Sequence, residues 1–184
     1  MGPPDPFTWL DDSTTVSGRS VCALCAAFPL PHLLTPVLRL HGLPADPDPE
    51  AWYPLARWVS VLNQVAADHG PLALFTAGQR VVELAPWPPD LRSLPQALAV
   101  LQATLRRSVR GPLPGGYHLE ELDPQSWRIV CLTPVPAAFD GGLLASPTRR
   151  FRTPDGSLAY VSPEPTPAGS PTALKWFRLS PELK

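Results

Sequence analysis

This chain of 184 residues has few of the features that mark a disulfide-bonded, membrane-bound or nucleic-acid-binding protein. Its three cysteines make a poor disulfide framework because their number is odd. The formal net charge of −1 gives no overall field toward nucleic acid or anionic lipid. The longest apolar stretch, Val21 to Leu34, is interrupted by prolines and is shorter than the roughly 20 residues that a membrane span needs. With no signal-peptide pattern at Met1, we expect a cytoplasmic protein that has no membrane partner.

No arrangement of residues typical of an active site occurs in the sequence. There is no Gly-x-Ser-x-Gly segment that would expose a nucleophilic serine. The glycine pairs Gly115-Gly116 and Gly141-Gly142 lack the lysine and hydroxyl residues of a phosphate-binding loop. His69 and His118 have acidic neighbours but no recognisable nucleophile to activate. We therefore expect no enzymatic activity and assign no catalytic residue.

The chain is rich in proline and in large apolar side chains. It contains 27 prolines, about three times the usual share of roughly 5%. With 44% hydrophobic residues and six tryptophans, the composition favours a folded domain with rigid loops over a disordered chain. A length of 184 residues fits one domain whose core is large enough to contain a pocket. We expect a flexible arm over residues 1–15 and a single domain over residues 16–184.

Hydrophobic residues at helical spacing dominate the chain as far as residue 111. In the strongest segment, apolar residues recur every three or four positions from Trp52 to Val65, and Gly70-Pro71 is expected to end that helix. Ser93 and Gln96 have the spacing of a capping box at the start of another helix. We therefore predict helices over residues 20–28, within 32–41, and over 50–69, 72–84 and 93–109.

Aromatic and β-branched residues become frequent after residue 111, which is typical of strands. We predict strands over residues 117–122, 127–132, 158–161 and 173–179, the first two joined in a hairpin by Asp123-Pro124. Helices first and strands last indicate an α+β fold, in which N-terminal helices pack on a C-terminal three- to four-stranded antiparallel sheet. One face of this sheet should be buried, through Trp127, Ile129 and Leu119 or through their opposite-parity neighbours.

Five weak motifs follow one another along the chain. They are Trp52-Tyr53-Pro54, the helix over 93–109, Gly115-Gly116-Tyr117, Cys131-Leu132-Thr133-Pro134-Val135-Pro136, and Phe139-Asp140-Gly141-Gly142 followed by Arg149-Arg150-Phe151. This order resembles bacterial stand-alone proteins related to the 4-vinyl-reductase-type domain and, more remotely, haem–nitric-oxide-binding domains. The resemblance spans roughly residues 16–179. It implies a ligand-binding or sensory regulatory module that has a hydrophobic pocket between helices and sheet and often forms a homodimer.

The resemblance and an aromatic-rich helix together predict that the module binds a small apolar or amphipathic molecule. Large aromatic side chains dominate the walls of apolar pockets. Each of them could instead only fill the core, and the sequence leaves both interpretations open. The candidate ligand-binding residues are Trp52, Tyr53, Trp58, Phe75 and Phe139.

The chain also departs from the pattern of these families. The resemblance implies that haem-binding relatives use an axial histidine and a Tyr-x-Ser-x-Arg segment, and no such segment occurs here, so we expect neither haem nor another cofactor. Relatives commonly carry further cysteines after the Pro-x-Pro segment and near the last strand. Here Ala137 and Ala138 follow instead, and no cysteine lies beyond Cys131, so we expect no metal site. Ser146-Pro147 is expected to interrupt any helix over 139–151.

Cys22 and Cys25 have the spacing of half a zinc site or of a redox pair. Zinc would need further ligands, for which His32, His41 and Cys131 are the candidates. Because no second paired motif occurs, we favour the interpretation that the two cysteines are small apolar residues on one face of a buried helix.

Two groups of arginines support an alternative, a structural or interaction protein that acts as a dimer and binds nucleic acid. Such binding would rest on electrostatic contacts to phosphates. Because the net charge is near zero and no nucleic-acid-binding motif occurs, we rank this alternative below ligand binding. The arginines concerned are Arg106, Arg107, Arg110, Arg149, Arg150 and Arg152.

Overall fold

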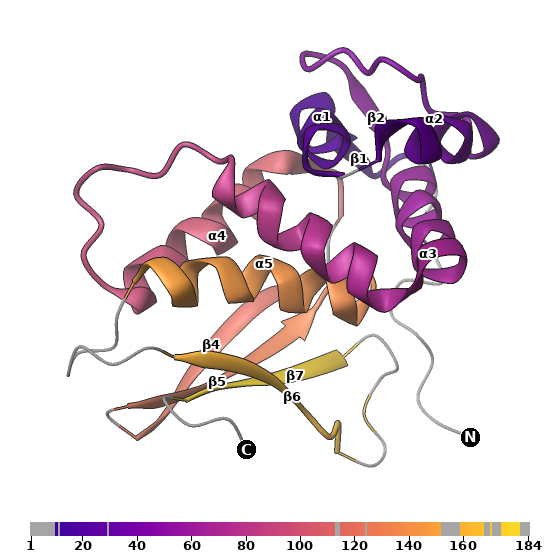
Figure 1. The fold of residues 1–184 in the computed structure, drawn as a ribbon. Helices are drawn as coiled ribbons and strands as arrows, with labels where there is room; N and C mark the ends of the chain where they lie inside the picture. Colours follow the sequence, from indigo (N-terminus) through magenta and orange to yellow (C-terminus); the bar gives the residue numbers. More distant parts are fainter. Residues whose placement is uncertain are drawn as a thin grey trace.

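The computed structural model describes residues 10, 12–28, 30–112, 115–123, 125–151, 159–167, 170 and 174–180. Within these ranges, helices cover one side of a four-stranded antiparallel sheet, and a small three-stranded sheet lies among the N-terminal helices (Figure 1). The predicted α+β fold is confirmed. The elements in chain order are β1 (Thr15–Ser17), α1 (Gly18–Ala27), α2 (Pro31–Leu40), β2 (Trp52–Pro54), α3 (Leu55–Glu83), α4 (Leu94–Ser108), β3 (Val109–Arg110), β4 (Gly116–Asp123), β5 (Ser126–Leu132), α5 (Ala137–Arg150), β6 (Tyr160–Glu164) and β7 (Leu174–Ser180).

The large sheet has the strand order β4-β5-β7-β6, and all its neighbouring strands are antiparallel. Side chains of a strand point to alternate faces, and Trp127, Ile129 and Cys131 of β5 all point to the buried one. Leu119 pairs with Ile129 across the hairpin and is half-buried against the same core. The prediction that one face of the sheet is buried is therefore confirmed, and of the two alternatives the buried face is that of Trp127, Ile129 and Leu119. α5 lies along this face of the sheet (Figure 1).

The small sheet was not predicted, and it replaces the first turn of a predicted helix. Residues 52–54 were expected to begin the helix over 50–69, but they form β2, which pairs with β1 through Val16 and Tyr53. Pro54 explains the difference, because the residue before a proline is driven away from helical backbone angles. β1 also pairs with β3, which links the N-terminal residues to the end of α4.

α3 contains both of the helices predicted over 50–69 and 72–84. They are joined through a sharp kink at Gly70, whose backbone angles are φ 81° and ψ 164°. A positive φ of this size is readily adopted by glycine alone, and Pro71 then begins the second half, where its missing N–H costs no helical hydrogen bond. The kink turns the second half of α3 across the other face of α5 (Figure 1).

α5 is continuous from Ala137 to Arg150, so the expected interruption at Ser146-Pro147 is wrong. Pro147 stands in the last turn, where it removes one backbone hydrogen bond without ending the helix earlier. The glycines of α5 allow α3 to approach closely: a Cβ on Gly142 would lie 2.1 Å from the carbonyl oxygen of Phe75. Packing against α3 therefore stabilises a helix whose own sequence is a poor helix former.

Two hydrophobic cores meet at α5. The first lies among β1 and helices α1 to α3 and receives Phe139 from α5. The second lies between α4, α5 and the large sheet and receives Leu144 from α5. Of the expected arm, residues 1–9 and 11 lie outside the described ranges, whereas Thr14 is fully buried and Thr15 begins β1. None of the helices in the described ranges is both long enough and apolar enough to cross a membrane.

Candidate functional site

A cavity of about 890 Å³ lies between the N-terminal helices and the layer that contains α4 and α5. Its lining comes from all three strands of the small sheet, from α1, α3, α4 and α5, and from the start of β4. Segments that are far apart in sequence therefore enclose it together. Most of the wall is apolar, and its aliphatic residues include Val16, Leu55, Val81, Val82, Val100, Leu101, Leu105, Val109, Val135 and Leu143.

Three of the five candidate ligand-binding residues, Trp52, Trp58 and Phe139, line this cavity. Trp58 of α3 and Phe139 of α5 meet edge to face, with ring centroids 5.7 Å apart and an interplanar angle of 81°. This arrangement is favourable for aromatic pairs and holds both rings in place. This pair therefore gives the wall one rigid aromatic surface, contributed by two helices.

The other two candidates, Tyr53 and Phe75, are not part of the lining. The Tyr53 hydroxyl accepts a hydrogen bond of 2.9 Å from the backbone N–H of Asp48. Phe75 packs at the crossing of α3 and α5, near the position where a Cβ on Gly141 would lie. Trp87, which sequence reasoning missed, does line the cavity, and its indole N–H donates to the Val82 carbonyl over 3.0 Å. A tryptophan among the prolines of a loop was the available signal, because loops often carry binding residues.

Charged side chains also belong to the lining. Arg19 and Glu50 form an exposed ion pair of 2.7 Å. Arg107, in the last turn of α4, and Arg110, in β3, are both exposed, and they have no ion-pair partner in the described part of the chain. The guanidinium of Arg110 lies 3.7 Å from the centroid of the Trp52 ring, in a cation–π contact. The cavity thus combines apolar walls with a positively charged rim.

A buried polar cluster, made of Tyr117, Thr133, Asp140 and Lys175, lies beside the cavity. The sheet register brings it together, because Tyr117 and Lys175 each pair with Cys131 of the strand between them. Asp140 comes from α5 and is fully buried. Tyr117 and Thr133 also line the cavity, so the cluster reaches its wall.

The hydrogen bonds of this buried polar cluster satisfy both charges. Asp140 accepts from the Tyr117 hydroxyl over 2.8 Å and from the Thr133 hydroxyl over 2.6 Å, and it pairs with the Lys175 ammonium. Lys175 also donates to the carbonyl oxygens of Thr133, over 2.9 Å, and Val135, over 2.6 Å. Burial, and then the charge of Asp140, raise the pKa of Tyr117 well above its ordinary value. Tyr117 therefore stays a neutral donor.

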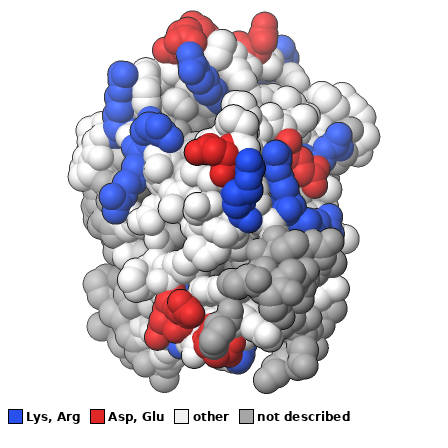
Figure 2. All heavy atoms as spheres, turned by 90° about the vertical axis from the view of Figure 1, so that its left-hand side faces the viewer, with Lys and Arg blue, Asp and Glu red and all other residues white. Residues whose placement is uncertain are grey.

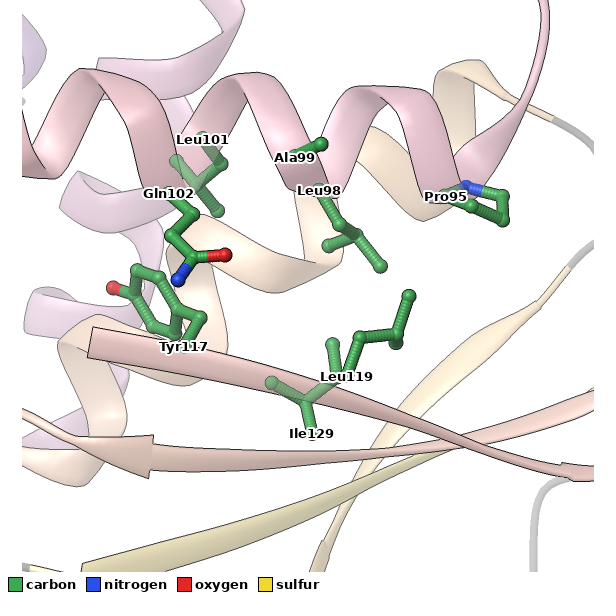
Figure 3. A pocket seen from close by; sticks show the side chains of 8 residues that line it. All are labelled: Pro95, Leu98, Ala99, Leu101, Gln102, Tyr117, Leu119 and Ile129. Atoms are coloured by element: carbon green, nitrogen blue, oxygen red, sulfur yellow. The ribbon is translucent and has the colours of Figure 1, made fainter. Parts of the chain in front are cut away.

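A smaller recess of about 90 Å³ lies between α4 and the β4–β5 hairpin. Leu98 of α4 points down toward Leu119 and Ile129 of the sheet, and Tyr117 lies at one end (Figure 3). Leu101 and Tyr117 line both this recess and the large cavity. The recess has room for a few atoms only, so we regard it as a side branch of the cavity.

The three cysteines are free, and they lie in two separate places. Cys22 of α1 lines the cavity, and its thiol donates to the Pro47 carbonyl over 3.1 Å. Cys25 is half-buried, and burial raises its pKa to about 11. Cys131 lies in the large sheet, and no group of three or more metal-ligating side chains occurs among the described residues. His32 and His41 therefore do not complete a zinc site with the two N-terminal cysteines.

The arginines of the nucleic-acid alternative lie at two ends of α4. Arg106 and Arg107 lie in its last turn and Arg110 follows in β3, whereas Arg149 and Arg150 precede Phe151, which packs on Trp87 in the loop before α4. α4 has 15 residues and is therefore about 22 Å long, and the two groups lie toward its opposite ends. On the face shown in Figure 2, basic and acidic side chains are interspersed rather than gathered. Arg152 lies outside the described residues.

The architecture is that of solved H-NOX domains. An Fe(II) unliganded H-NOX protein mutant from K. algicida has a TM-score of 0.65 and 14% identity, covering 89% of this chain and 95% of its own. An oxygen-binding H-NOX domain related to soluble guanylate cyclases has a TM-score of 0.61 and 13% identity, covering 89% of this chain and 91% of its own. A mutant of T. Tengcongensis H-NOX has a TM-score of 0.60 and 13% identity, covering 88% of this chain and 92% of its own. At such identities the likeness concerns the fold. The sequence matches no protein-family model and no curated protein.

A further similar structure concerns haem distortion in the H-NOX family, but the cavity residues of this chain do not fit haem. Haem iron is held by histidine, by a cysteine or tyrosine anion, or by methionine. None of the chain's four histidines and no methionine belongs to the described lining. Burial, followed by the charges of Asp46 and Asp48, raises the pKa of Cys22, and the Tyr117 hydroxyl donates to Asp140. Both groups are therefore held in their protonated forms, which bind iron poorly.

Proposed function

We propose that this protein is a non-enzymatic module that binds a small apolar or amphipathic molecule in the large cavity, as a sensory or regulatory domain does. The observation that carries the proposal is the cavity itself, about 890 Å³ in volume and lined mainly by aliphatic and aromatic side chains. Small-molecule sites in proteins typically measure about 300–1,000 Å³ and have this composition. The fold shared with H-NOX domains, one of them described as oxygen-binding, supports the proposal.

An apolar ligand would be bound mainly by the removal of hydrocarbon from water. Each Å² of apolar surface buried contributes about 25 cal/mol. The edge-to-face pair of Trp58 and Phe139 offers a rigid surface, so little side-chain freedom would be lost on binding. We place this function ahead of an interaction surface because the arginines lie in two separate groups. The homodimer and the nucleic-acid surface stay predictions.

The test is ligand binding by the whole chain, with a variant that fills the cavity. Ala23 of α1 lines the cavity, and Ala23→Phe would place a ring inside it. Ala103→Phe is the matched control, because Ala103 is exposed on α4 and is not part of the lining. We expect native mass spectrometry to show an added mass after incubation with a lipid and metabolite extract. The same extract should raise Tm, since a ligand of the native state stabilises it.

Both effects should be lost in Ala23→Phe and kept in Ala103→Phe. Equal binding by the two variants would place the ligand elsewhere on the protein. Absence of any bound mass with the wild-type chain, together with an unchanged Tm, would contradict the proposed function.

A further inference from the structure

The charged side chains of the cavity rim are unequally paired. Arg19 is neutralised by Glu50, to which it donates over 2.7 Å. Arg107 and Arg110 have no such partner in the part of the chain that the structure describes, although both line the same cavity. The rim therefore carries a net positive charge on the side formed by the end of α4 and by β3.

The local structure fixes one of these cations, Arg110, at the rim. β3 continues directly from α4 and is held by pairing with β1, in the register Thr15 with Arg110. The ring of Trp52 supports the Arg110 guanidinium, whose central carbon lies 3.7 Å from the ring centroid, and a cation–π contact leaves the N–H donors of the guanidinium available to a ligand. An anion that meets this edge could accept two parallel hydrogen bonds.

The neutral polar side chains nearby have their donors engaged. The Thr104 hydroxyl donates to the Val100 carbonyl over 2.8 Å, and the Ser108 hydroxyl donates to the Thr104 carbonyl over 2.8 Å. Thr104 and Ser108 line the cavity between the aliphatic wall and the rim. Among the described residues of α4 and β3 that line the cavity, the guanidinium groups of Arg107 and Arg110 are therefore free to donate to a ligand.

We propose that the ligand is an amphipathic anion, whose apolar body lies in the cavity and whose single anionic group binds Arg107 and Arg110. This inference rests on the proposed function and names the class of molecule that the cavity takes. Hydrocarbon walls select the body, and two cations that have no acidic partner among the described residues select the end group. Basic residues in the last turn of a helix also complement the helix dipole, but that role does not require their side chains to line a cavity.

Two fluorescent compounds with the same apolar body test the inference: 4-(1-pyrenyl)butanoate, which is an anion, and 4-(1-pyrenyl)butanol, which is neutral. Their Kd values are measured by quenching of the protein's tryptophan fluorescence at low salt. We expect the wild-type chain to bind the anion about tenfold more tightly, because hydrogen bonds to charged groups are stronger than neutral ones. The difference should shrink as salt is added, since the two arginines are exposed.

The variants Arg107→Gln and Arg110→Gln, singly and combined, should weaken binding of the anion and leave binding of the alcohol unchanged. Arg106→Gln is the matched control: it removes the same charge from the same helix turn, but Arg106 is not part of the lining. Arg107→Gln keeps the inference testable if the Arg110 change disturbs β3, because Arg107 is exposed and lies outside every strand.

Three outcomes are separable in this experiment. Equal affinity for the anion and the alcohol, with both lost in Ala23→Phe, would overturn the inference and leave the proposed function in place. A preference for the anion that Arg106→Gln abolishes as fully as Arg107→Gln does would overturn it too, because general charge would then explain the preference. Failure of both compounds to bind, with no added mass from the extract, would contradict the proposed function and this inference together.

Discussion

The two hydrophobic cores on either side of α5 differ in chemistry. The first core, among α1, α2 and α3, consists of hydrocarbon and aromatic side chains, and the ion pairs on that side, Arg19–Glu50 and Arg57–Asp12, are exposed. On the sheet side, the ion pair of Lys175 with Asp140 is buried within a polar cluster. Apolar packing therefore determines how α1, α2 and α3 lie against one another, whereas hydrogen bonds of fixed direction also hold α5 over the sheet.

The difference matters because the cavity lies between the two regions. Its wall on the helical side is apolar, and this side can change volume at the cost of packing alone. On the sheet side, a shift of α5 would part Asp140 from Tyr117, Thr133 and Lys175 at once. We therefore expect the buried polar cluster to hold α5, which contributes to the cavity wall, in one position. Substitutions can separate the contribution of these hydrogen bonds from that of apolar packing.

The largest effect is expected from Lys175→Met, which keeps the length of the side chain and removes its charge. Asp140 would then be a fully buried carboxylate without a cation. Removing one partner of a buried ion pair typically costs about 3–5 kcal/mol. We expect the free energy of unfolding in urea to fall by this amount. A loss below about 1 kcal/mol would show that the cluster is not a main support of the fold.

A second substitution sharpens this test. In the double variant Lys175→Met with Asp140→Asn, no uncompensated charge is buried. The amide oxygen can accept from one of the two hydroxyls, of Tyr117 and Thr133, while the amide N–H donates to the other. We expect the double variant to be more stable than Lys175→Met alone by at least about 1 kcal/mol. Additive losses would contradict direct coupling between the two residues.

The crossing of α3 and α5, where packing alone decides, gives the next largest effect. In Gly142→Ala, the new Cβ would lie 2.1 Å from the carbonyl oxygen of Phe75, and backbone atoms cannot move aside. Gly141→Ala is the matched control, because its nearest neighbours are side-chain ring atoms, of Phe177 at 3.2 Å and of Phe75 at 3.5 Å. We expect Gly142→Ala to cost about 1–3 kcal/mol in urea unfolding and Gly141→Ala clearly less. Equal losses would mean that the helices can separate freely.

Elements that depend on local rules were predicted well from the sequence. The capping box of α4 is formed, because the Ser93 N–H donates to the Gln96 side chain over 3.2 Å. Alternation along β5 predicted that one face of the sheet is buried, although it left open which of the two faces that is. The small sheet was not predicted, because its strands at 15–17, 52–54 and 109–110 pair over long distances in sequence. α5 was misjudged because contacts with α3, which a sequence does not show, outweigh its glycines and Pro147.

The candidate site was predicted only in part. Residue type and the family resemblance pointed to Trp52, Trp58 and Phe139, which do line the cavity, but nothing local separates them from Phe75, which packs between helices. The buried polar cluster was missed, although β7 contained a signal. Lys175 has the same parity as the buried residues Phe177 and Leu179, and a lysine at an inward position needs a partner.

The smallest effect is expected at alkaline pH, and it also separates the two cores. Burial, together with the charge of Asp140, raises the pKa of Cys131 well above its ordinary value of 9.0, while Lys175 lowers it in part. A raised pKa means that the folded chain keeps its proton after the unfolded chain has lost it. This contribution to stability is complete below pH 9 and is lost as pH rises from there toward the folded pKa. Each such group lowers the free energy of unfolding by at most about 1.4 kcal/mol per pH unit.

Cys131→Ala measures the share of this one thiol. Urea unfolding at pH 8, 9 and 10 should give a shallower fall in stability for the variant than for the wild-type chain, whatever their difference at pH 8. The pKa values of Tyr117 and Cys25 are also raised by burial. The free energy of unfolding of the variant therefore still falls as pH rises, only less steeply. Cys25→Ala, on the helical side, should reduce the fall of the unfolding free energy with pH by a smaller amount, because Cys25 is only half-buried. Parallel curves for wild type and Cys131→Ala would show that the sheet side opens to water before the thiol ionises.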